Sequence, residues 1–230
     1  MSRKGWLTGG AVVAVVAIVV ALIVVSVSGG DSGSEVSASE VKGVAAAVAL
    51  GKGIPQSGFA IGEADAPVTV REFIDPQCPV CQTASETTIP GIITGPVTAG
   101  TARLIIEPLT FLGSDSSTAS IAIAAAAEQD LAFTYTEILY ANQGKENSGW
   151  VTDDVLRAFA AETPGLDVAT WDTARTGTAV GTALFATSDR AVAAGVTATP
   201  TFVIHGPGGT EIITGASELA KILAAIEAVR

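Results

Sequence analysis

The sequence has few residues of the types that bind metals or nucleic acids. Its 230 residues include two cysteines, one histidine and 12 basic residues. A structural zinc site usually needs four ligands, so two cysteines and His205 cannot form one within a single chain. The 23 acidic residues bring the formal net charge to −11, which argues against nucleic-acid binding because that function needs a basic face. A metal shared between two copies, or Cu(I) held by the two thiolates, stays open.

Charged residues are also scarce, at 15% of the chain against roughly 25% in an average soluble protein. No charged residue occurs between Leu7 and Val27, and this stretch is long enough to cross a bilayer as a helix. Arg3 and Lys4 precede it, which predicts a cytoplasmic N-terminus and an extracytoplasmic remainder. We therefore expect residues 1–28 to form a cytoplasmic stub and a transmembrane anchor in the cell membrane. A cleaved signal peptide is the alternative, although its apolar part usually has 7 to 15 residues.

A polar segment rich in serine and glycine follows the apolar stretch. We expect residues 29–57 to form a flexible linker with a possible short helix at 41–50, because small polar side chains bury too little surface to fold. The compact domain is then expected at 58–230. It has 172 or so residues, which is enough for a hydrophobic core without disulfide bonds.

The domain reads as an α/β fold. Alternating apolar residues predict a strand at 67–74, a helix starting at Cys78-Pro79 and a second strand at 101–108, the order of a parallel βαβ unit. Three or four helices are expected between residues 116 and 194. A hairpin with strands at 201–204 and 210–214 and an amphipathic helix at 217–229 complete the chain.

The two cysteines, Cys78 and Cys81, are three positions apart. A disulfide bond between them would close a very small loop and contribute little to stability, so we expect them to serve chemistry instead. A sulfur at a helix N-terminus lies near unpaired N–H groups, which favour the thiolate and lower a cysteine pKa to roughly 3.5–7.5. Cys78 is therefore predicted to be the nucleophile and Cys81, one turn deeper, the resolving thiol.

The residues around this pair resemble a known family. The segment Pro-Val-Thr-Val-Arg-Glu-Phe-Ile-Asp-Pro-Gln-Cys-Pro-Val-Cys, the Thr-Pro-Thr at 199–201 and the helical stretch between them resemble the DsbA-like thiol-disulfide oxidoreductases of the thioredoxin superfamily, and most of all their membrane-anchored bacterial members. The resemblance implies a thioredoxin fold with a helical insertion at about 116–194, between a βαβ half and a ββα half.

The resemblance also implies roles for three residues outside the cysteine pair. Pro200 matches the family's cis-proline, and Thr199 matches the residue that tunes the disulfide and contacts the substrate backbone. Glu72 matches a buried acid that moves the proton of the resolving cysteine. The alternatives are an ordinary trans proline at position 200 and a strand glutamate at position 72 that pairs with Arg71 or Arg103.

Pro79 and Val80 stand between the two cysteines. Strongly oxidising family members carry histidine at the position of Val80, so a cation that stabilises the thiolate is missing here. The reduction potential is therefore expected between about −120 mV, the oxidase end, and about −270 mV, the thioredoxin end.

The resulting hypothesis is an extracytoplasmic enzyme that introduces disulfides into exported proteins and needs no cofactor. The family implies re-oxidation by a membrane quinone-linked partner of the DsbB or VKOR type. An exported reductase acting on cytochrome or metal-site thiols is the first alternative. A non-catalytic module that binds peptides or copper is the second.

Overall fold

The computed structural model describes residues 41–216 and 218–230. The predicted membrane anchor, the stub before it and residues 29–40 of the predicted linker lie outside the described residues. Within the described ranges, no helix combines the length and the apolar character needed to cross a membrane.

One mixed sheet forms the centre of the domain, with the strand order β1-β2-β4-β3-β5-β6. The neighbours β3 and β4 are parallel, and every other adjacent pair is antiparallel. The strands are β1 (Gln56–Ser57), β2 (Ala60–Ile61), β3 (Val68–Ile74), β4 (Ala102–Pro108), β5 (Thr201–Gly206) and β6 (Gly209–Thr214).

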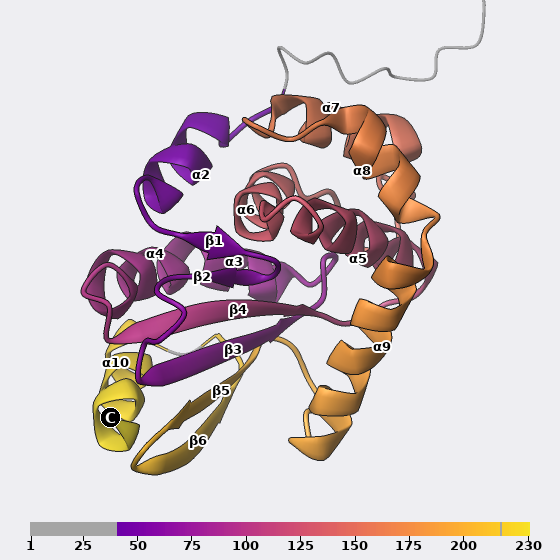
Figure 1. Cartoon of the computed structure of the whole chain (residues 1–230). Helices are drawn as coiled ribbons and strands as arrows, with labels where there is room; N and C mark the ends of the chain where they lie inside the picture. Colours follow the sequence, from indigo (N-terminus) through magenta and orange to yellow (C-terminus); the bar gives the residue numbers. More distant parts are fainter. Residues whose placement is uncertain (1–40, 217) are drawn as a thin grey trace, which may run out of the picture. The chain divides into compact units, whose positions relative to one another are not determined.

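Helices fill the connections and complete the layers around this sheet. In Figure 1, α5 and α6 lie side by side, and α10 lies next to the β5–β6 hairpin. The helices are α2 (Val44–Gly51), α3 (Pro79–Thr87), α4 (Ile89–Ile92), α5 (Ser114–Ala127), α6 (Ala132–Ala141), α7 (Asp153–Glu162), α8 (Val168–Arg175), α9 (Thr178–Ala193) and α10 (Leu219–Val229), with a π-helical turn, η2 (Ile93–Val97), after α4. The expected α/β arrangement is observed, with a βαβ half (β3, α3, β4) and a ββα half (β5, β6, α10) separated by the inserted helices.

The two faces of β3 differ in what covers them. Val70, Glu72 and Ile74 point to one face, where the main core gathers side chains from α3, α5, α6 and α10. Phe73 points to the other face and packs with Leu109 and with Ala191 of α9. The central strand is therefore buried on both sides, as expected for a strand with a parallel neighbour.

The insertion contains five helices, α5–α9, where three or four were expected. The unexpected breaks fall at residues 128–131, where Asp130 adopts a left-handed backbone with φ 60°, and at residues 176–177. Neither break carries a proline, and only the second contains a glycine, Gly177, so composition marks the first break weakly. Thr152 and Asp167 start α7 and α8 by accepting hydrogen bonds from the backbone N–H groups of Val155 and Thr170.

The compact domain begins earlier than the expected boundary near residue 58. The short helix predicted at 41–50 exists as α2, but it packs against α6 with Ala47 buried and belongs to the same compact unit as the sheet. β1 also adds residues 56–57 to the sheet. The alanines of α2 favour helix and leave a smooth surface for packing, which distinguishes residues 44–57 from a flexible linker.

Candidate active site

Cys78 lies where β3 gives way to α3, at the N-cap of the helix. Its backbone is extended, its N–H donates to the carbonyl oxygen of Asp75 at 2.9 Å, and Pro79 occupies the first helical turn. Proline fits there because its missing N–H would have no helical partner. The unpaired N–H groups of this turn therefore surround the sulfur of Cys78.

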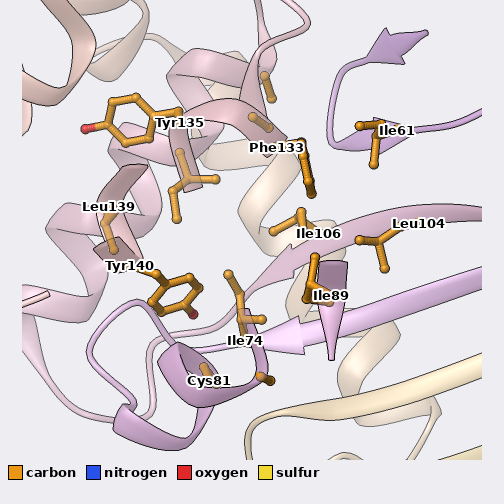
Figure 2. Packing of buried hydrophobic residues seen from close by; sticks show 14 of the residues in the cluster. Ile61, Ile74, Cys81, Ile89, Leu104, Ile106, Phe133, Tyr135, Leu139 and Tyr140 are labelled. Carbon is orange, nitrogen blue, oxygen red and sulfur yellow. The ribbon is translucent and has the colours of Figure 1, made fainter. Parts of the chain in front are cut away.

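Cys81 lies one turn further along α3 and points into the core. Figure 2 shows it near the buried side chains of Ile74 and Tyr140. Cys81 is fully buried, Cys78 is 7% exposed, and both are free thiols. Val80 between them is 43% exposed. A reacting partner from solvent therefore reaches Cys78 and not Cys81.

Residues 199 and 200 meet Cys78 although they follow it by more than 120 positions. The Cys78 Sγ–H donates to the carbonyl oxygen of Thr199 at 3.5 Å. The Thr199–Pro200 peptide bond is cis, and Pro200 is buried while Thr199 remains partly exposed. β5 starts directly after this bond and pairs with β3, so the pairing of these strands brings the two segments together.

The pKa values of the two thiols are shifted in opposite directions. Hydrogen bonding to Cys81, supported by the Thr199 side chain and by the backbone N–H groups of Val80 and Cys81, lowers the Cys78 pKa to about 6, although burial opposes this. Burial raises the Cys81 pKa far above its usual value, and the nearby charges of Cys78 and Glu72 raise it further. At neutral pH the pair therefore consists of a thiolate at Cys78 and a thiol at Cys81.

Glu72 is buried in β3 on the same face as the main core. Its cross-strand neighbours in register are Ile106 and Phe202, both apolar and buried. This burial raises the Glu72 pKa well above its usual value, and the charge of Glu137 raises it further. The alternative ion pair is not seen, since Arg71 pairs with Glu107 and Arg103 bonds Thr69 and Ala64.

A buried polar network holds the loop before Cys78. Both oxygens of the Asp75 carboxyl accept hydrogen bonds, Oδ1 from Ser116 at 2.7 Å and from the Gln77 N–H at 2.9 Å, and Oδ2 from the Leu112 N–H at 3.0 Å. The Gln77 side-chain amide in turn donates to Ser116 at 3.0 Å. The loop is thus fixed both by its own hydrogen bond from Gln77 to Asp75 and by contacts with Leu112 and Ser116 around the start of α5.

Two further hydrogen bonds reach the loop from α6 and the residues after it. The Gln143 Nε2 donates to the carbonyl oxygen of Pro76 at 2.8 Å, and the Tyr140 hydroxyl donates to that of Asp75 at 3.1 Å. Tyr140 lies in α6 and Gln143 just after it, so the helical insertion holds the loop before Cys78. The described residues contain no group of three or more His, Cys, Asp or Glu side chains arranged to hold a metal ion.

The family follows from a comparison with known proteins. A thioredoxin family model matches residues 56–228, from β1 to α10. The chain belongs to the thioredoxin family. A relative from Bacillus cereus named "Probable disulfide bond formation protein D" is 33% identical over 111 residues, which is 47% of this chain and 51% of the relative. A protein of the same name from Bacillus anthracis is 32% identical over the same length. The chain matches about half the length of these relatives.

Solved structures of thioredoxin-family members share the fold. BdbD from Bacillus subtilis in its oxidised form aligns with a TM-score of 0.66 and 24% identity, covering 75% of this chain and 94% of that chain. DsbA from Chlamydia trachomatis aligns with a TM-score of 0.60 and 22% identity, covering 74% of this chain and 89% of that chain. At these identities the likeness establishes the thioredoxin-like fold with its helical insertion.

Sequence analysis missed the residues that hold the site from outside the motif. Asp75, Gln77 and Glu137 were not singled out as site residues from the sequence. A carboxylate directly before the cysteine pair was a usable signal for Asp75. Nothing in the sequence shows that Ser116, Tyr140 and Gln143 approach it, because these contacts span 41 to 67 positions.

Proposed function

We propose that the chain is a protein disulfide oxidoreductase that acts outside the cytoplasm and introduces disulfides into exported proteins. The observation that carries the proposal is the difference between the two sulfurs, an accessible Cys78 with a pKa of about 6 and a buried Cys81 that stays protonated. The names of the Bacillus relatives, which refer to disulfide bond formation, support the same reaction.

The reaction begins with the oxidised pair. A substrate thiolate attacks Cys78 Sγ, so a substrate–Cys78 disulfide forms while the Cys78–Cys81 bond breaks and Cys81 leaves with the electron pair. The Cys81 thiolate takes a proton because its pKa is strongly raised. A second substrate thiolate then displaces Cys78, which leaves as a stable thiolate. The substrate dithiol is oxidised and the enzyme disulfide is reduced.

Glu72 is the proposed proton donor to Cys81. Burial raises the Glu72 pKa well above its ordinary value, which favours the protonated form, and the charge of Glu72 raises the pKa of Cys81. Thr199 and Pro200 are proposed to contact an extended substrate segment, in the manner of strand addition, because the Thr199 carbonyl already faces the nucleophile. Pro79 and Val80 form the exposed part of the motif beside it.

Residues 7–27 are proposed to anchor the enzyme as a single-pass membrane protein with a cytoplasmic N-terminus. The charge-free run and the two preceding basic residues support this arrangement. A membrane quinone-linked re-oxidase of the DsbB or VKOR type is the proposed partner, because each catalytic cycle leaves the enzyme reduced.

One experiment separates the oxidase from a reductase. The soluble part, residues 41–230, is equilibrated with glutathione and the reduction potential of Cys78–Cys81 is measured. A potential well above −180 mV supports the oxidase, whereas one below about −220 mV overturns it in favour of the reductase, which the missing histidine at Val80 favours. Cys78→Ala must abolish exchange with a peptide dithiol. Retained exchange in that variant overturns the mechanism, and peptide binding without exchange in the wild type indicates a binding module.

A further inference from the structure

A cavity of about 350 Å³ opens next to α3, and neither Thr199 nor Pro200 lines it. Its wall includes the apolar side of α2 together with Ser85 and Glu86 of α3 and Glu137 of α6. None of these residues belongs to the cysteine motif. The cavity is open to solvent, so it offers water a route toward the interior between α3 and α6.

Glu137 is the one carboxyl group of α6, and it occupies the inner wall of this cavity. The Ser85 hydroxyl donates to Glu137 Oε2 at 3.0 Å. Burial raises the Glu137 pKa to about 8, with the Ser85 hydrogen bond acting in the opposite direction. Both the protonated and the charged form are therefore populated near neutral pH, which suits a group that exchanges protons.

Ser85 connects Glu137 to the redox pair through the geometry of α3. Cys81 and Ser85 are four positions apart and are both buried, so they lie on one face of the helix and about 6 Å apart along its axis. The Gln82 side-chain amide also donates to the Tyr140 carbonyl at 2.9 Å, so two side-chain bonds hold α3 against α6 at this point.

Glu72 connects the same two groups from the sheet. The charge of Glu72 raises the pKa of Cys81, and the charge of Glu137 raises the pKa of Glu72. Of these three ionisable groups, Glu137 is the one that lines the cavity. Ile106 and Phe202 flank Glu72 and give it no polar partner in the sheet.

We propose that Glu137, oriented by Ser85, is the outlet through which Glu72 exchanges its proton with solvent in this cavity. This inference rests on the proposed function. When the Cys78–Cys81 bond breaks, the departing Cys81 thiolate takes the proton of Glu72, Glu72 takes one from Glu137, and Glu137 takes one from water in the cavity. The electrons come only from the substrate thiolates, and the relay moves one proton inward for each disulfide reduced.

Few other charges surround Glu137 in the part of the chain that the structure describes. α2 has no ionisable side chain, and α3 contributes Glu86, which is exposed at the cavity rim. β3 contributes Glu72, and Tyr140 on α6 stays protonated because burial raises its pKa. On α7, Asp153 and Arg157 pair with Arg175 and Asp172 of α8. The titration of Glu137 is therefore governed by its burial and by Ser85.

The test is the single-turnover reduction of the oxidised protein by dithiothreitol, quenched with acid and followed by thiol labelling between pH 6 and 9. In the wild type, the rate per dithiothreitol thiolate is expected to fall as the pH rises through about 8, because Glu137 loses its proton. In Glu137→Gln the rate at pH 7 is expected to be about tenfold lower, less than the roughly 100-fold contributed by a direct proton donor. In this variant the decrease of the rate near pH 8 is expected to be absent.

Two further variants make the result specific. Ser85→Ala removes the hydrogen bond that lowers the Glu137 pKa, so the fall is expected above pH 8. Glu86→Gln neutralises the exposed carboxylate of the same cavity and is expected to match the wild type. Thermal melting of each variant checks that it is folded.

The outcomes also separate this inference from the function on which it rests. If the wild type exchanges with dithiothreitol and Glu137→Gln has the same rate and pH profile, the outlet is overturned and the oxidoreductase function stands. If the wild-type disulfide does not exchange, the proposed function itself fails. A Cys78 pKa that changes in Glu137→Gln also contradicts the relay, because the relay runs from Glu137 through Glu72 to Cys81 and does not include Cys78.

Discussion

At the scale of single residues, three positions in sequence separate two very different thiols. Cys78 is at the helix N-cap and keeps 7% of its surface exposed, while Cys81 is fully buried one turn away. The same residue type therefore has a lowered pKa in one place and a raised pKa in the other. The difference comes from hydrogen bonding and burial, since Val80 provides no cation at the position where histidine would stand.

The first prediction concerns the cause of the low Cys78 pKa. Hydrogen bonding to Cys81 is its largest cause, and the Thr199 side chain makes a smaller contribution. Cys81→Ala is therefore expected to raise the Cys78 pKa from about 6 toward the ordinary value of about 8.5, and Thr199→Val to raise it by less. The measurement is the pH dependence of iodoacetamide alkylation of the reduced protein. Thr83→Ala, on the exposed side of α3, is the control, and an unchanged pKa in Cys81→Ala would contradict this assignment.

The second prediction concerns the network behind Cys78. Ser116 donates to the buried Asp75 carboxyl at 2.7 Å and accepts from Gln77 at 3.0 Å. Ser116→Ala is expected to lower the free energy of unfolding by about 1.5–3 kcal/mol, the usual range for a hydrogen bond to a charged group. Urea unfolding of this variant and of Ser117→Ala, its partly exposed neighbour, provides the comparison. If the two variants had the same free energy of unfolding, the proposed role of Asp75 in fixing the loop would be wrong.

At the scale of elements, α9 is attached to the sheet by a buried carboxylate. Glu107 in β4 is fully buried and accepts from Arg190 at 2.8 and 2.7 Å and from Thr187 at 2.7 Å, both on α9. Arg71 of β3 pairs with the same carboxylate. The last helix of the insertion is thus tied to the two central strands, directly before the segment that carries Thr199 and Pro200.

The third prediction follows from this attachment. Arg190→Ala is expected to destabilise the protein by about 1.5–3 kcal/mol, because it removes two charge-assisted hydrogen bonds and leaves Glu107 with fewer donors. Arg190→Lys is expected to recover only part of this, since an ammonium group cannot donate in the same forked geometry. Arg157→Ala breaks an exposed ion pair with Asp172 and is expected to cost less than about 1 kcal/mol. Urea unfolding measures all three, and an Arg190→Ala effect no larger than that of Arg157→Ala would contradict the role of Glu107.

The sequence predicted those helices and strands whose own residues show a periodic apolar pattern, a helix start or a turn. β3 has alternating apolar residues, α3 begins with proline after Cys78, and the β5–β6 hairpin has a glycine-rich turn, so each was expected within a few positions of its observed place. β1 and β2 have two residues each and no periodicity, so only strand pairing creates them, of β2 with β4 and of β1 with β2. The packing of α2 on α6 was missed for the same reason, because an alanine-rich helix beside glycine and serine resembles a linker.

The candidate site divides in the same way. Cys78, Cys81 and Glu72 are close in sequence, and the pairing of β5 with β3 places Thr199 beside Cys78, so motif and resemblance could propose these residues and Pro200, whose roles stay predictions. Glu137 was not predictable because its environment is tertiary. In an isolated helix a glutamate is solvated and has an ordinary pKa, and only contact with Ser85 and burial between α3 and α6 change it.

At the scale of the whole molecule, the Cys78 pKa links redox state, stability and pH. In the reduced protein this pKa is about 6 in the folded state and about 8.5 when unfolded. The unfolded chain therefore binds more protons between these values, and folding stability rises with pH across this window and is lost as the pH falls through 6. Cys81 is protonated in both states below about pH 8.5 and adds no slope there. The oxidised protein has neither thiol, while Glu72 and Glu137 titrate in both redox forms.

The fourth prediction is that the reduced protein melts above the oxidised protein at pH 7 and that the difference shrinks as the pH is lowered to 5. An oxidising disulfide is one whose reduced form is more stable, so the thermodynamic cycle requires this order if the chain is an oxidase. For a domain of this size each kcal/mol corresponds to about 2–4 °C in melting temperature, so differential scanning calorimetry of the two forms resolves the effect. Reduced Cys78→Ser lacks the thiolate and is expected to lose this slope with pH. A more stable oxidised form across this range would instead mean that the same two cysteines donate electrons to their substrates.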